Sequence, residues 1–155
     1  MLLDPFIAKN VSYGVIDSLL STTGLTLGIH AAGVTNKQVI ITGIILILVE
    51  ALSMSYGSFI SDETFIIASH TKYSTFKVIK YAVIMFLAYV LAGLIPLVPF
   101  WFDMSHKQYI SMGLSLATLF IIIKLFRRSV TQTMLLTLLG TIILYVSILV
   151  GKKMK

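Results

Sequence analysis

The sequence predicts an all-α integral membrane protein with five transmembrane helices. Of its 155 residues, 57% are hydrophobic and only 12% are charged, a composition too apolar for a soluble domain. Apolar stretches of membrane length also follow one another with short connections, which leaves no room for a separate soluble domain. Helices are expected because lipid offers no partner to open strands and the alternation of barrel strands is absent. We therefore interpret residues 1–155 as a single transmembrane domain.

Short polar segments separate the predicted spans. The spans cover residues 11–34, 38–61, 78–102, 108–126 and 130–151. The connections 35–37, 103–107 and 127–129 are so short that the spans they join should be antiparallel neighbours. Residues 62–77 form a longer connection, predicted to be a solvated loop that contains Asp62, Glu63 and His70. Pro96 and Pro99 should kink or end the third span.

Basic residues at the span ends predict the orientation. The N-terminus is predicted to be cytoplasmic, because seven basic residues then lie inside and five outside. The inner set is Lys9, Lys72, Lys77, Lys80, Lys124, Arg127 and Arg128, and the outer set is Lys37, Lys107, Lys152, Lys153 and Lys155. The net charge of +6 is thus assigned to contacts with lipid headgroups and not to nucleic acid. Residues 1–10 lack the pattern of a signal peptide, so the first span should be retained.

Two carboxylates interrupt these apolar spans, Asp17 in the first and Glu50 in the second. An ionised acid at mid-bilayer costs roughly 2.5–3.5 kcal/mol on insertion scales, so such residues usually face a polar pathway. Helical spacing places Asp17 on one face with Ser21, Gly24 and Gly28, and the last two form a GxxxG pair suited to close helix contact. The second span has a similar stripe, composed of Gly43, Glu50, Met54, Gly57 and Ser61 with Ser53 beside it. We interpret the two stripes as lining one passage.

Glu50 and Met54 are one helical turn apart, where a carboxylate and a thioether could contact the same ion. Oxygen combined with soft sulfur favours a transition metal over Mg²⁺ or Ca²⁺. A buried carboxyl group tends to hold a proton, whereas metal binding requires the anion. Metal and proton would therefore compete for one site, which is the physical basis of antiport.

Other interpretations of these residues stay open. Either acid could be structural, satisfied by a neighbouring helix, and Met54 could serve only in packing. His30 and His106 are interpreted as interfacial residues. An intramembrane enzyme has little support, because the spans lack a Ser/His, paired-Asp or HExxH arrangement.

Three segments together resemble the vacuolar iron transporter family. They are YGVIDSLLSTTGLTLGI, EALSMSYGSFIS and LAGLIPLVPFWF, which occur in that order over nearly the whole chain. The resemblance implies a five-helix homodimer in a prokaryotic cell membrane that exports Fe²⁺ or Mn²⁺ from the cytoplasm in exchange for protons, with no permanently bound cofactor. It also implies that Asp17 and Met54 are metal ligands at the dimer interface and that Glu50 matches an acid found in some members.

The chain departs from the family pattern at three places. The metal-collecting helical domain between spans two and three is missing, and Ser58 and Ser18 stand where an acid and a glycine are common. We predict a proton-coupled divalent-metal transporter that uses Asp17, Glu50 and Met54, with Ser21 and Ser53 as secondary donors and Gly24, Gly28 and Gly57 in helix packing. The alternative is a membrane assembly or regulatory component that keeps the fold without transporting.

Overall fold

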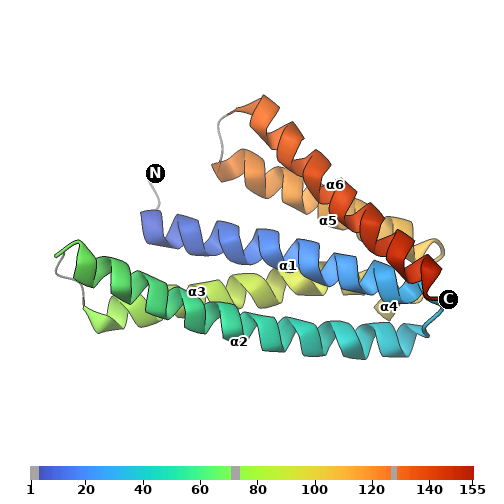
Figure 1. Cartoon of the computed structure of the whole chain (residues 1–155), viewed down its shortest axis with the longest axis horizontal. Coiled ribbons are helices and arrows are strands. Elements are labelled where there is room, and N and C mark those ends of the chain that lie inside the picture. Colours follow the sequence, from blue (N-terminus) through green and yellow to red (C-terminus); the bar gives the residue numbers. More distant parts are fainter. Residues whose placement is uncertain (1–3, 71–73, 127–128) are drawn as a thin grey trace.

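The computed structural model describes residues 4–70, 74–126 and 129–155, which form helices and no strands (Figure 1). The long helices are α1 (Pro5–Ala31), α2 (Asn36–Ala68), α3 (Thr75–Leu94), α5 (Lys107–Phe126) and α6 (Val130–Lys153). A 3-10 turn, η1 (Ile95–Leu97), and the short α4 (Val98–Trp101) follow α3. Each predicted span overlaps one of these helical regions, so the all-helical prediction is confirmed.

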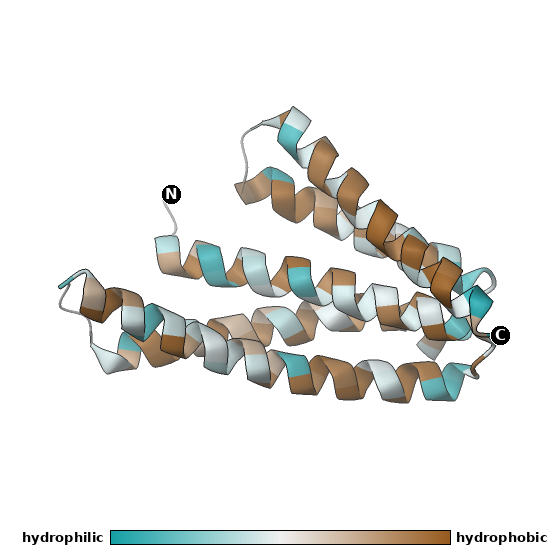
Figure 2. Ribbon diagram, viewed as in Figure 1, coloured by the Kyte–Doolittle hydropathy of each residue, from teal (hydrophilic) through white to brown (hydrophobic). Residues whose placement is uncertain are grey.

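Four of the described helical stretches are long and apolar enough to cross a membrane: α2, Thr75–Trp101, α5 and α6. Helix α1 is not among them, although it overlaps the first predicted span. Its many polar residues make it less apolar, and its position accommodates them, because α1 contacts α2, α3, α5 and α6 (Figure 1). Its buried residues include Asn10, Ser18, Thr22, Thr23 and Thr26, and Figure 2 shows it less apolar than α6.

Small residues bring α1 close to α6. Gly24 and Gly28 lie against Ser147, so the GxxxG pair makes a contact within the chain. A Cβ at Gly151 would lie 1.9 Å from the Gly28 carbonyl oxygen, so the two backbones touch at this crossing. Nearby, the Thr23 hydroxyl donates to Ser115 Oγ on α5 at 2.8 Å, which satisfies a buried polar group.

The prediction of a loop over residues 62–77 is wrong for most of its length. Helix α2 continues to Ala68 and α3 begins at Thr75, so Asp62 and Glu63 are helical and only His70 lies in the connection. Residues 62–68 contain neither Gly nor Pro, and the next helix begins only where the Ser74 hydroxyl caps the Phe76 N–H at 3.3 Å. Lys72, Arg127 and Arg128, which support the predicted orientation, lie outside the described residues.

The proline-rich segment after α3 changes the direction of the chain as expected. Helix α3 ends at Leu94, directly before the 3-10 turn that contains Pro96, and α4 includes Pro99. Phe100 is buried against the ring of His30, whereas Trp101 is 60% exposed. The segment thus anchors one end of the bundle and returns the chain towards α5.

Asp4 is the N-cap of α1, and we predict the effect of replacing it. Its carboxylate accepts hydrogen bonds from the Phe6 N–H at 2.9 Å and the Tyr81 hydroxyl at 2.7 Å. Asp4→Ala should lower the unfolding temperature in detergent, because loss of an N-cap costs about 1 kcal/mol. The Tyr81 hydrogen bond holds the pKa of Asp4 below its usual range. This stabilisation should therefore be present at neutral pH and be lost as the pH falls through that lowered pKa.

Asp4→Asn is the control for this prediction, since asparagine also caps helices well. Asp4→Asn should keep an unfolding temperature close to that of the wild type at neutral pH. The fall in unfolding temperature that protonation of Asp4 causes in acid should be absent from this variant. Equal unfolding temperatures for wild type and Asp4→Ala would contradict the assigned cap.

Candidate ion pathway

Glu50 is held by a hydrogen-bonded chain that joins three helices. It is half-buried on α2 and accepts a hydrogen bond from the Tyr89 hydroxyl of α3. The same hydroxyl lies 2.7 Å from Ser21 Oγ on α1, and Ser18 Oγ donates to the Tyr89 carbonyl oxygen at 2.6 Å. Tyr89 is fully buried, which makes it the fixed centre of the chain. Glu50 therefore has a defined place inside the bundle.

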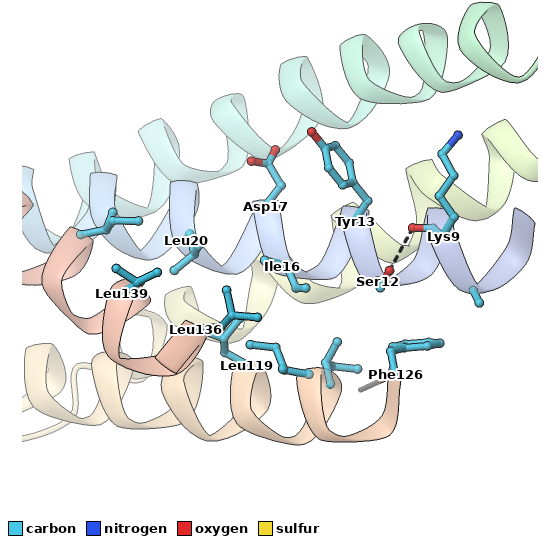
Figure 3. Close-up of a pocket in the computed structure, with 15 residues that line it drawn as sticks. Lys9, Ser12, Tyr13, Ile16, Asp17, Leu20, Leu119, Phe126, Leu136 and Leu139 are labelled. Atoms are coloured by element: carbon cyan, nitrogen blue, oxygen red, sulfur yellow. Dashed lines mark hydrogen bonds between the residues drawn. The ribbon is translucent and has the colours of Figure 1, made fainter. Parts of the chain in front are cut away.

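Asp17 is half-buried one turn before Ser21 on α1. The Tyr89 hydroxyl links Ser21 to Glu50, so hydrogen bonds join the helices that carry the two predicted acids one turn away from Asp17. Among the residues that the structure describes, none donates a hydrogen bond to the Asp17 carboxylate. Figure 3 shows Asp17, Tyr13 and Lys9 projecting from one side of α1, away from Leu119 and Leu136. This carboxylate is thus free to bind a cation or a proton.

Met54 is half-buried on α2 and packs against the cluster that contains Tyr89. It also lines a cavity of about 440 Å³ together with Ser53, Asn10 and the buried Met85. Two thioethers and several polar groups therefore surround one space. Met85 is a possible soft ligand that the sequence alone did not single out.

Asp17 and Met54 do not line the same cavity. Asp17 lines a cavity of about 700 Å³ that residues of α1, α5 and α6 surround. Lys9 and Tyr13 line both spaces and so stand between them. Within the described ranges, no three His, Asp or Glu side chains gather into a metal site. The described part of the chain therefore places Asp17 one turn from Ser21, which the Tyr89 hydroxyl links to Glu50, and places Met54 one turn from Glu50.

The remaining predicted residues take different positions. Ser21 is hydrogen-bonded to the Tyr89 hydroxyl, whereas Ser53 is exposed and lines the cavity beside Met54. Gly57 is exposed, and a Cβ there would meet no described atom within 4 Å. His30 packs edge-on against Phe100, and His106 is exposed in a connection.

Sequence reasoning missed two features of this region. One is Tyr89, a hydroxyl in the middle of an apolar span that could have been noticed as a partner for Glu50. The other is a polar network in which the exposed Lys9 pairs with Asp62, and Asp62 is buried together with Asn10 and Ser58. Steps of four residues from Glu50 lead through Met54 and Ser58 to Asp62, so extending the helix by one residue would have included this acid.

The fold and these side chains define a helical membrane protein with carboxylates inside its bundle, a class that moves ions. Residues 8–70, which include most of α1 and all of α2, match the family model of the VIT family. This match supports membership of the vacuolar iron transporter family, and the connection between α2 and α3 is short in this chain. No curated protein and no solved structure matches the chain. The match indicates metal transport across a membrane.

Proposed function

We propose that this protein exports Fe²⁺ or Mn²⁺ from the cytoplasm in exchange for protons. The observation that carries the proposal is the set of hydrogen bonds through Tyr89, which links Glu50 to Ser21 of α1, one turn from Asp17. Met54 lies one turn from Glu50 on α2. Carboxylate oxygen and thioether sulfur together suit a divalent transition metal better than Mg²⁺ or Ca²⁺. Proton coupling follows because the carboxylates must lose their protons before they bind metal.

The transporting unit in this proposal is a homodimer of five-span protomers. Helix α1 is the fifth span and relies on its neighbours to cover its polar residues. On α2, Ser53, Gly57 and Ser61 are exposed, and Tyr13 on α1 is 60% exposed. A second copy over this face would bring two further acids to the pathway and cover hydroxyls that lipid cannot satisfy. The N-terminus faces the cytoplasm of a prokaryotic cell.

A non-transporting assembly or regulatory component is the alternative function. It is favoured by the separate cavities of Asp17 and Met54 and by the missing three-residue metal cluster in the described part of the chain. The two functions differ in whether metal crosses the bilayer.

Flux through reconstituted protein tests the proposal. Purified chain in liposomes with an acidic lumen should take up Mn²⁺ or Fe²⁺, reported by a metal-sensitive dye inside the vesicles. Collapse of the pH gradient with a protonophore and a potassium ionophore should stop the uptake, and protein-free liposomes provide the background. Uptake no faster than this background, at any pH gradient, would reject transport and favour the alternative.

A further inference from the structure

A buried carboxylate lies one turn beyond Ser58 and outside the proposed metal site. Asp62 on α2 is 1% exposed and forms an ion pair with Lys9 of α1. The Asn10 side-chain amide donates to Asp62 Oδ2 at 3.1 Å, and Ser58 Oγ lies 3.4 Å from the same oxygen. A buried carboxylate without a cation would be strongly destabilising, so this position requires a positive charge.

Asp62, which pairs with Lys9, and the two residues hydrogen-bonded to this carboxylate carry oxygen atoms that bind hard or borderline divalent cations. Asp62 supplies two carboxylate oxygens, Ser58 a hydroxyl, and Asn10 a side-chain carbonyl oxygen that accepts from Ser58. Oxygen donors of these kinds coordinate Mn²⁺ and similar ions. Lysine is a compact charge on a flexible stem, and the Lys9 side chain is 50% exposed, so it can leave without unfolding the helix.

Lys9 also stands at the junction of three cavities. It lines the space beside Asp17, the space beside Met54, and a third cavity of about 280 Å³ that Asp62 and Phe65 line. A fixed ammonium there would repel a divalent cation that approaches either Asp17 or Met54. Movement of the Lys9 ammonium would therefore control whether a cation binds at Asp62. It would also control whether that cation passes on towards Asp17 or Met54.

We propose that Asp62, Ser58 and Asn10 form a second, capture site for divalent cations, and that the Lys9 ammonium occupies this site until a metal ion displaces it. The role in capture rests on the proposed transport function, but cation binding at Asp62 does not require it. In this chain α2 connects to α3 directly, and the site lies at the same end of the bundle as that connection. The Lys9–Asp62 pair thus keeps the empty site neutral and closed.

Mn²⁺ binding to the full-length chain in detergent tests this site, with Asp17→Asn as the background to remove the proposed pathway ligand. Bound Mn²⁺ is measured by electron paramagnetic resonance. Adding Lys9→Met should tighten Mn²⁺ binding about tenfold or more, because the competing ammonium is gone. Mn²⁺ should also raise the unfolding temperature of this variant more than that of its parent. The charge control is Lys80→Met, an exposed lysine on α3, which should leave binding unchanged.

The ligand is tested by adding Asp62→Asn to Lys9→Met. This double substitution removes both charges of the ion pair and leaves neither unpaired. It should abolish the gained binding, whereas Glu63→Gln should retain it. Equal effects of Lys9→Met and Lys80→Met, or tight binding that persists without the Asp62 carboxylate, would overturn the proposal. Should Asp62→Asn fail to fold, Ser58→Ala replaces it and should weaken binding severalfold, and unchanged binding would count against the site. Flux without this Mn²⁺ site would reject only the capture site, and the site without flux would reject only transport.

Discussion

Asp17→Asn is expected to abolish metal uptake by liposomes that contain the protein. Asparagine keeps the size of the side chain but lacks the anion that a divalent metal requires. Mutation of a residue that only hydrogen-bonds to a metal ligand typically lowers metal affinity or activity by about 10- to 100-fold. Loss of a direct ligand should therefore lower the rate of uptake at least as much. The measurement is the initial rate of Mn²⁺ uptake under an acidic-lumen gradient, normalised to the amount of inserted protein.

Asp103→Asn is the matched control for this prediction. Asp103 is an exposed acid in the connection before α5, where the hydrogen bond from Lys107 at 2.6 Å holds its pKa below the usual range. It is therefore ionised at the assay pH, and its replacement removes the same charge outside the spans. Uptake should remain at the wild-type rate. If Asp17→Asn transported as fast as Asp103→Asn, Asp17 would be a structural acid.

Gly151→Ala should have the largest effect on stability among the helix-packing glycines. The added Cβ would lie 1.9 Å from the Gly28 carbonyl oxygen, far inside van der Waals contact, and this oxygen belongs to the backbone and cannot rotate away. Overpacking of this kind typically costs about 1–3 kcal/mol. We expect a lower unfolding temperature, measured by circular dichroism in detergent, because α6 must move away from α1.

Gly113→Ala separates this clash from the general effect of alanine on helices. Gly113 lies on α5, and a Cβ there would meet no described atom within 4 Å. Since alanine favours a helix over glycine by about 1 kcal/mol, this control should unfold at the same or a higher temperature. An unfolding temperature that rises equally in both variants would show that α1 and α6 are not in close contact at Gly151.

Much of the helical fold could be predicted because a bilayer permits few alternatives. Apolar length located the helices, and Pro96 located the end of α3. The end of α2 was misplaced because Asp62 and Glu63 look like loop residues when their partners are unknown. In the folded chain Lys9 neutralises Asp62, so the helix can continue through it.

The candidate site could be predicted only in part, and for a related reason. Asp17 and Glu50 are conspicuous because an acid in an apolar span is costly wherever it points. Tyr89, Met85 and Lys9 are ordinary residues in their own segments and become notable only through the neighbours that folding gives them.

The sequence by itself thus determined the helical membrane class, the family resemblance and the two acids, because hydropathy and charge act within single segments. Only the tertiary structure decided that the GxxxG pair of α1 contacts α6, that Tyr89 holds Glu50, and that Lys9 neutralises Asp62. These contacts join residues far apart in the chain. Their free energy depends on distance and burial, which are properties of the packed bundle and not of any one segment.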